Sequence, residues 1–241
     1  MSRFTFSYDA PRAAPSGLVD PVNDPAKLAA VGAAVSSRLS GKPGIVAHGG
    51  TKADLFTIPG FRDAKECARL VSVIDSRIGP SELFEGTEVD GFRTSSTHHF
   101  DEGDPDVVSL QRAIADALGI PVAHAEVMQG QRYLPGQQYK HHFDYFTPGQ
   151  PYWQQERRRG GQRSWTAMLC LNEPEAGGAT DFHKLGVAIP PKTGTLVVWN
   201  NMDAGGHPNP ATLHAGMPVD AGAKYVITQW FRQDEWSLHL R

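Results

Sequence analysis

The sequence predicts an α+β protein whose core is mainly β, built as a sandwich or jelly roll with N-terminal helices packed on one sheet. Apolar residues recur at helical spacing in three segments before residue 120, whereas after Pro121 the pattern shifts toward the alternation of strands. Turn-forming pairs such as Pro135-Gly136 and Gly177-Gly178 separate the later segments. Short strands at this spacing are typical of sandwiches and jelly rolls, which the helices would close on one side.

Three segments carry the start and stop signals of helices. An aspartate that can cap the first turn opens each one, and in two of them a proline follows at the first helical position. The segments begin at Asp24-Pro25, Asp63 and Asp104-Pro105, and they end before Gly41, Gly79 and Gly119. Their apolar stripes predict packing against a sheet, and no function is assigned to them.

Eight strands are predicted in the second half of the chain. They are His124–Tyr133, Gln138–Phe146, Arg163–Asn172, Ala179–Phe182, Val187–Ile189, Thr195–Asn200, Leu213–Val219 and Lys224–Arg232. We expect one domain over residues 23–241, with a helical layer over about 23–120 and the jelly roll over about 121–241, because the helices would lack a core of their own. Residues 1–22 are rich in Pro, Ala and Ser and are predicted to form an N-terminal arm.

The composition is that of an ordinary globular protein. Of the 241 residues, 40% are hydrophobic and 20% charged, and the formal net charge of -3 argues against a nucleic-acid partner. The two cysteines show no zinc or redox spacing and are expected to be buried thiols, which fits a reducing compartment. No apolar run approaches a membrane span and no secretory leader opens the chain, so a cytoplasmic location is expected.

A metal centre is the central hypothesis for function. His142 and Asp144 lie two residues apart, so on a strand both side chains would project from one face, while His141 would face the other way. His214 could supply a third ligand. Two histidines and one carboxylate form the ligand set of non-haem Fe(II) oxygenases, although a histidine two residues before an aspartate is by itself a weak signal.

Lys224 adds to this hypothesis. It begins a strand whose same-face positions are Val226, Thr228 and Trp230, so a cation, a hydroxyl and an aromatic ring would line a wall beside the metal. A dicarboxylate that chelates iron at one end needs a positive partner at the other, and a buried lysine can supply it. A solvated strand end is the alternative for a lone lysine.

With these residues in place, the sequence resembles the prolyl 4-hydroxylases among the Fe(II)- and 2-oxoglutarate-dependent dioxygenases. The resemblance runs from about Thr57 to Trp230 and is specific only when its motifs are taken together in order. The motifs are RTS (Arg93–Ser95), RYLPGQQYKHHFDYF (Arg132–Phe146), GGQR (Gly160–Arg163), CLN (Cys170–Asn172), GGATDF (Gly177–Phe182), PPKTGTLVVW (Pro190–Trp199), LHAGMPV (Leu213–Val219) and GAKYVITQW (Gly222–Trp230).

The resemblance implies a double-stranded β-helix with a defined division of roles. His142, Asp144 and His214 would bind Fe(II), with O2 as oxidant and ascorbate as an expected stimulant. Lys224, Tyr133, Thr228 and Trp230 would line the site of the co-substrate 2-oxoglutarate. Tyr139, Arg163 and Arg93 would face a peptide or protein substrate containing proline. Tyr139 has the opposite strand parity to His142, so only a strand that begins irregularly after Gly136 would bring the two together.

The substrate stays open at this point. Residues 147–162, which include Trp153 and the arginines Arg157 to Arg159, lie where a substrate lid would be and weakly favour a chain over a free amino acid. The alternatives are the same chemistry on a free amino acid or other small molecule, a non-catalytic metal-binding or sugar-binding jelly roll, and nucleic-acid demethylation, against which the net charge argues. The sequence predicts no oligomeric state.

Overall fold

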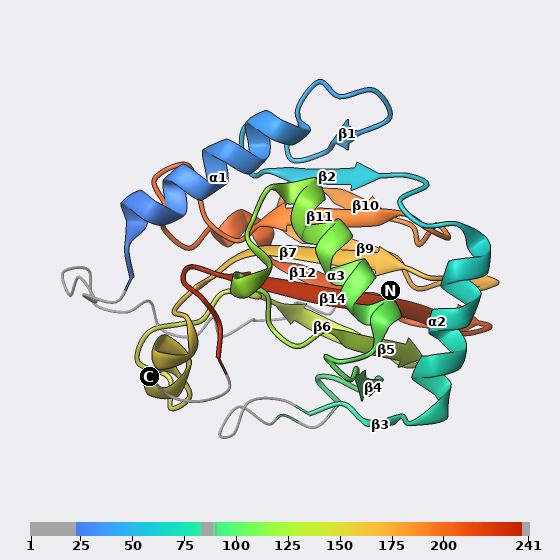
Figure 1. Cartoon of the computed structure of the whole chain (residues 1–241). Coiled ribbons are helices and arrows are strands. Elements are labelled where there is room, and N and C mark those ends of the chain that lie inside the picture. The colour runs from blue at the N-terminus through green and yellow to red at the C-terminus, as the bar shows by residue number, and fades with distance from the viewer. Residues whose placement is uncertain (1–22, 83–88, 90, 238–241) are drawn as a thin grey trace, which may run out of the picture.

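Two β-sheets face each other in the computed structural model, and helices cover the outer side of the larger one (Figure 1). The structure describes residues 23–82, 89 and 91–237. The predicted N-terminal arm, residues 1–22, lies outside these residues. None of the described helices is long and apolar enough to cross a membrane.

The larger sheet has eight strands, and every neighbouring pair that it contains is antiparallel. In spatial order they are β1 (Val46–Ala47), β2 (Leu55–Ile58), β11 (Leu196–Asn200), β7 (Arg163–Cys170), β14 (Lys224–Arg232), β5 (Gln129–Tyr133), β4 (Ser96–His99) and β3 (Gly79–Pro80). The smaller sheet has the order β10 (Val187–Ile189), β9 (Thr180–Phe182), β12 (His214–Gly216) and β6 (Tyr139–His142). A separate ribbon pairs β13 (Val219–Ala221) with β8 (Ala176–Gly177). This arrangement confirms the predicted jelly-roll core.

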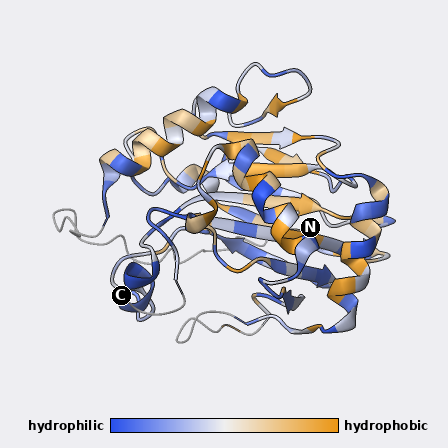
Figure 2. Cartoon of the chain, viewed as in Figure 1, coloured by the Kyte–Doolittle hydropathy of each residue, from blue (hydrophilic) through white to orange (hydrophobic). Residues whose placement is uncertain are grey.

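The three predicted helices are present and begin where the capping signals placed them. They are α1 (Pro25–Leu39), α2 (Ala64–Ser76) and α3 (Pro105–Leu118). Asp63 forms a reciprocal capping box with Glu66 at the start of α2, and Gly119 ends α3 in a left-handed conformation with φ of 74°. Each of these helices carries apolar and polar residues on different faces (Figure 2).

Two apolar layers follow from the alternation along the central strands. On β7 and β14, Leu169 and Ile227 pack with the helices, whereas Met168 and Val226 point into the space between the two sheets. β7 is buried on both faces, and from Trp165 to Cys170 its residues are apolar except for Thr166. The functional side chains described below lie in the inner of these two layers.

Several strand predictions need correction. Strands β1 to β4 lie before residue 120 and all four extend the larger sheet, β1 and β2 at one edge and β3 and β4 at the other, although only helices were predicted there. The segment predicted as one strand over Leu213–Val219 is divided between β12 and β13, which belong to different sheets; Pro218 between them has no backbone N–H to donate. The strand predicted from His124 begins only at Gln129, because residues 122–124 form a short 3₁₀ helix, η1 (Val122–His124).

The remaining short helices lie in loops. They are α4 (Trp153–Glu156), η2 (Arg157–Arg159), η3 (His183–Leu185) and η4 (Pro210–Thr212). α4 and η2 occupy the segment 147–162 that was predicted to act as a lid over the substrate.

Candidate active site

His142, Asp144 and His214 converge between the two sheets. His142 and His214 are cross-strand partners on β6 and β12, and Asp144 follows β6 by two residues. The Nε2 atoms of His142 and His214 lie 3.7 and 3.9 Å from Oδ1 of Asp144. One ligand atom from each residue lies within 4.8 Å of the other two. The three predicted ligands are therefore brought together from segments far apart in the sequence.

The imidazoles of His142 and His214 are each oriented by a hydrogen bond from Nδ1, the nitrogen that faces away from Asp144. Nδ1 of His142 donates to the carbonyl of Lys140 at 2.7 Å, and Nδ1 of His214 donates to the carbonyl of Thr212 at 2.9 Å. The unprotonated Nε2 of each ring then points toward Asp144. Burial and the neighbouring His214 lower the pKa of His142 to about 3, so its ring is neutral at physiological pH.

Asp144 is held ionised and in place from the larger sheet. Burial would raise the pKa of its carboxyl, but His214, His142 and Arg163 outweigh that effect and lower it. Thr166 on β7 donates its hydroxyl hydrogen to Oδ2 of Asp144 at 2.8 Å, and Asn201 Nδ2 donates to the same threonine oxygen at 3.0 Å. This chain of hydrogen bonds fixes the carboxylate and leaves Oδ1 directed at the imidazoles.

Aromatic rings enclose His214. Its ring centroid lies 4.9 Å from that of Trp199 and 5.4 Å from that of Phe182, with the Phe182 ring stacked on it. Only 5% of His214 is exposed. The ring is thus packed on several sides, and Nε2 is left facing the carboxylate.

Lys224 is buried in the same inner layer and has no acidic partner. Its Nζ lies 5.4 Å from the centroid of the Tyr133 ring and 3.5 Å from the hydroxyl of Thr180. Burial lowers its pKa to about 8, an effect that Cys170 counteracts in part. Among the described residues, none of the ion pairs involves Lys224. A buried ammonium group without a counter-ion favours binding of an anion.

The other residues predicted beside Lys224 line the same cavity, which extends to the histidines. Thr228 donates to Oε1 of Gln131 at 3.1 Å, and Nε1 of Trp230 is buried without a hydrogen-bond partner. The cavity is lined by His142, Asp144, His214, Lys224, Tyr133, Thr180, Thr228 and Trp230, among others. The alternating positions from Lys224 to Trp230 therefore share one face, as predicted.

Tyr139 stacks on His142, with ring centroids 3.6 Å apart and the rings inclined by 14°. The pairing of β6 with β12 explains why Tyr139 points to the same side as His142. His214 pairs with His142 and Gly216 with Tyr139, so three residue steps on β6 face two on β12. This bulge shifts the alternation by one residue and turns Tyr139 to the face of His142. The guanidinium carbon of Arg93 also lies over the Tyr139 ring, 4.9 Å from its centroid.

The guanidinium group of Arg163 contacts two aromatic rings. Its guanidinium carbon is 4.1 Å from the centroid of Trp230 and 4.8 Å from that of Phe146. Nε and Nη2 of Arg163 donate to the two carboxylate oxygens of buried Glu126 at 2.6 and 2.7 Å. This pair fixes the arginine at the inner end of an outer pocket.

The outer pocket has a volume of about 420 Å³, and His142 and Asp144 lie in its wall. Arg93, Tyr139, Arg163, Tyr152 and Trp230 contribute to its wall. Trp153, which was expected to grip a substrate from the lid, is only 2% exposed and packs near Phe146. Of the two aromatic residues in segment 147–162, Tyr152 is the one that reaches the pocket.

Comparison with known proteins decides the family. The family model of the 2OG-Fe(II) oxygenase superfamily matches residues 128–232, which contain His142, Asp144, His214 and Lys224. Over these residues the chain is a 2OG-Fe(II) oxygenase domain. It is prolyl 4-hydroxylase-like, as the following relatives indicate.

One relative of this oxygenase is prolyl 4-hydroxylase 2 of Arabidopsis thaliana, 29% identical over 220 residues that cover 80% of this chain and 72% of the relative. The crystal structure of the viral collagen prolyl hydroxylase of Paramecium bursaria chlorella virus 1 in complex with 2OG is 29% identical, with a TM-score of 0.58 over 78% of this chain and 98% of the other. A Trichoplax adhaerens prolyl hydroxylase in complex with a hypoxia-inducible factor peptide shares the fold, with a TM-score of 0.57 at 16% identity over 86% of this chain and 91% of the other.

The donor set of this oxygenase fits a ferrous ion. The Nε2 atoms of His142 and His214 lie 3.7 and 3.9 Å from Oδ1 of Asp144, which is too long for hydrogen bonds. Atoms that bind one ion at metal–ligand distances near 2.0–2.2 Å lie up to roughly 4.4 Å apart, so these separations suit a shared ion. Two neutral imidazoles and one carboxylate on one side of an ion leave its other positions open. The Nδ1 and Thr166 hydrogen bonds are the outer contacts that orient such ligands.

Sequence reasoning missed the residues that support the site. Thr166 and Asn201 orient Asp144, Glu126 orients Arg163, and Thr180 contacts Lys224. Thr166, within the otherwise apolar run from Trp165 to Cys170, was a usable signal. Glu126 gave none, because its partners lie 37 and 106 residues away.

Proposed function

We propose that this oxygenase hydroxylates a prolyl residue in a peptide or protein and converts 2-oxoglutarate to succinate and CO2. The observation that carries the proposal is one continuous cavity with a facial histidine–aspartate–histidine set at one end and the unpaired ammonium group of Lys224 at the other. A site of this kind suits a dicarboxylate that chelates a metal with its oxo-acid end. The names of the relatives support the prolyl substrate.

His142, Asp144 and His214 are the proposed Fe(II) ligands. When bound, Fe(II) with 2-oxoglutarate and O2 supplies the oxidising chemistry, in which one oxygen atom enters the substrate C–H bond and the other enters succinate. The protein holds both imidazoles in the tautomer that presents Nε2, and Thr166 keeps the Asp144 carboxylate from rotating. Asp144 and His214 are buried and the side chain of His142 is only 11% exposed, which limits the access of bulk water.

Lys224 is the proposed partner of the far carboxylate of 2-oxoglutarate. Pairing with that carboxylate would stabilise the ammonium group and raise its pKa, which burial lowers, back toward the ordinary value. Thr180 and Tyr133 lie beside Nζ and would donate hydroxyl hydrogens to the same carboxylate. Thr228 and Trp230 would form the wall along which the co-substrate lies.

Tyr139, Arg163 and Arg93 are the proposed contacts to the peptide. Tyr139 stacks on the proposed ligand His142 and lines the open pocket, and Arg93 and Arg163 line the same pocket, where they would meet a bound chain. The pocket is open at the surface, which suits an internal residue of a chain rather than a free amino acid.

The test is succinate release by the iron-loaded protein. The substrate panel holds proline-containing peptides, the same peptides with proline replaced by alanine, and free amino acids. Stimulation by the prolyl peptides alone supports the proposal, while stimulation by a free amino acid supports the small-molecule alternative. Metal binding without any succinate, even in the uncoupled reaction, would indicate a non-catalytic jelly roll. Runs with and without ascorbate test the expected stimulation.

A further inference from the structure

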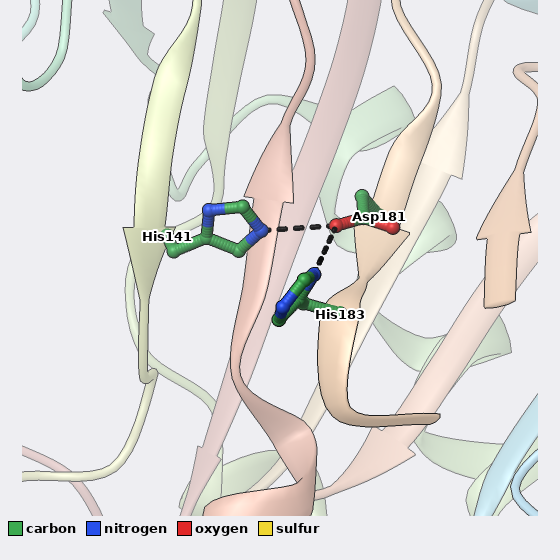
Figure 3. Close-up of side chains that lie close together, drawn as sticks. All are labelled: His141, Asp181 and His183. Carbon is green, nitrogen blue, oxygen red and sulfur yellow. Dashed lines mark hydrogen bonds and ion pairs between the residues drawn. The ribbon is translucent and has the colours of Figure 1, made fainter. Parts of the chain in front are cut away.

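A second group of potential metal ligands lies on the other face of the smaller sheet (Figure 3). It consists of His141, Asp181 and His183. Nε2 of His141 lies 2.9 Å from Oδ2 of Asp181, and Nδ1 of His183 lies 3.9 Å from the same oxygen. One ligand atom from each residue lies within 4.8 Å of the other two. We call these three residues the outer cluster.

Strand alternation separates the outer cluster from the active site. His141 precedes His142 on β6, and Asp181 lies between Thr180 and Phe182 on β9, so each points away from its inward-facing neighbours. β12 runs between these two strands, and its residue Ala215 is the cross-strand partner of Asp181. Since alanine ends at Cβ, the imidazole and the carboxylate can meet above it across the middle strand.

A simple hydrogen-bonded pair accounts for His141 and Asp181 but not for His183. At 3.9 Å, Nδ1 of His183 is beyond hydrogen-bond distance, yet it faces the oxygen that His141 already contacts. The two imidazole rings lie 5.3 Å apart at an angle of 68°. Two imidazoles directed at one carboxylate oxygen are an arrangement that an ion bound between the three groups explains.

We propose that the outer cluster binds one divalent transition-metal ion of the zinc type. Imidazole and carboxylate ligands suit Zn²⁺, Co²⁺, Ni²⁺ and Cu²⁺, whereas Mg²⁺ and Ca²⁺ prefer sites made of oxygen atoms alone. The side chains of His141, Asp181 and His183 are 35%, 23% and 71% exposed, so water can reach the remaining positions of the ion. The exposed His183 can turn to shorten its distance without moving a strand.

The ion would connect β6 to β9 across β12. These strands also carry His142 and Thr180, which face the proposed iron and 2-oxoglutarate sites. Occupancy of the outer cluster therefore stabilises the strands that support the active site. This inference does not depend on the proposed reaction, because it concerns ligands on the opposite face of the sheet.

The experiment is a titration of the metal-free full-length protein with Zn²⁺, followed by calorimetry and by metal analysis after dialysis. Zn²⁺ also fits the active-site histidines, so the wild type is expected to bind two equivalents. His183→Ala and Asp181→Asn are each expected to bind one, with affinity at the outer cluster reduced by at least about tenfold. The matched control is His207→Ala, because His207 lies 3.7 Å from Asp203 at an exposed site where the described residues offer no third ligand.

Retention of two equivalents by His207→Ala together with loss of one in both cluster variants supports the proposal. A single equivalent in the wild type, or two in His183→Ala, would overturn it. Asp144→Ala combined with His214→Ala provides a second test, since that variant should keep one equivalent and a thermal shift with Zn²⁺. If it does not fold, the comparison between the wild type and His183→Ala decides the question alone. Failure of succinate release would leave these titrations unaffected.

Discussion

Glu126 accepts both of its short hydrogen bonds to Arg163 from the same edge of the guanidinium group, at 2.6 and 2.7 Å. Arg232, the cross-strand partner of Arg163, donates to the same carboxylate. Burial alone would raise the pKa of Glu126, but the two arginines outweigh it and lower the pKa. One buried carboxylate thus holds two buried cations and positions the one at the outer pocket.

Replacing Glu126 with Gln should destabilise the fold and impair peptide binding. The change removes the charge but keeps the size, so both arginines lose their shared counter-ion, at an expected cost of about 3–5 kcal/mol in the free energy of unfolding. The KM for the peptide should rise while that for 2-oxoglutarate stays near the wild-type value. Urea denaturation and peptide titrations measure the two effects. An unchanged peptide KM in a folded variant would show that Glu126 does not position Arg163 for binding.

Thr166→Val should weaken binding of Fe(II). The substitution preserves the shape of the side chain but removes the hydroxyl that donates to Oδ2 of Asp144, so the carboxylate is no longer held in orientation. Loss of such an outer contact typically costs about ten- to hundredfold in metal affinity. A titration with Fe(II), monitored by succinate release, measures this affinity. Thr57→Val is a suitable control, because Thr57 is a buried strand threonine bonded to His48 and remote from the site.

Asp144→Glu should lower kcat by about hundredfold, because one added methylene displaces the ligand oxygen by about 1 Å while the charge is kept. Single-turnover succinate release with saturating Fe(II) measures this loss. Asp220→Glu, at an exposed position, is the matched control for the same chemical change. Wild-type turnover by the Asp144 variant would contradict its assignment as a metal ligand.

Lys224→Ala should raise the KM for 2-oxoglutarate by about ten- to hundredfold and leave the iron requirement nearly unchanged. The variant removes the charge-assisted contact to the far carboxylate but none of the metal ligands. Parallel titrations of 2-oxoglutarate and of Fe(II) measure the KM for the co-substrate and the iron requirement separately. Equal increases in both requirements would point to a general disruption of the cavity instead.

Binding of 2-oxoglutarate should weaken above pH 8. The pKa of Lys224 is lowered from its ordinary value to about 8, so the free protein loses this charge as the pH rises through 8, and affinity should fall about tenfold between pH 7 and pH 9. Over the same range the unfolded chain binds more protons at this residue than the folded chain, so its contribution to stability becomes more favourable with rising pH. Direct binding measurements on the metal-loaded protein across this range test the first effect. Lys224→Arg should remove it, because its guanidinium stays charged.

The sequence allowed prediction of those parts of the site that depend on local alternation. Lys224, Val226, Thr228 and Trp230 share a face because their spacing is even within β14. His142 and Asp144 also line one cavity, but β6 ends at His142 and Asp144 lies in the bend that follows, so the strand predicted over Gln138–Phe146 is shorter than expected. Tyr139 shows the limit. Its direction depends on a bulge created by pairing with Gly216, some 77 residues later, which the sequence of β6 alone does not encode.

Long-range pairing also explains the missed strands and supports. β2 is a four-residue apolar run that could belong to a strand or a buried helical turn, and only its position beside β11 makes it a strand. Pro218 separates β12 from β13, yet a continuous strand was predicted there. Glu126 reads as an ordinary polar residue until Arg163 and Arg232 are brought to it by the sheet.

Lys224 belongs to the eight-stranded sheet, whereas His142 and His214 belong to the four-stranded one. A molecule of 2-oxoglutarate held at both ends would therefore connect the two sheets, with its far carboxylate at the larger sheet and its oxo-acid end at the smaller one. Its fit would depend on how far apart the sheets stand, and so on the size of the apolar side chains that keep them apart. Larger side chains at Met168 or Val226, neither of which carries a charge, would therefore weaken the binding of 2-oxoglutarate, as the loss of Lys224 would.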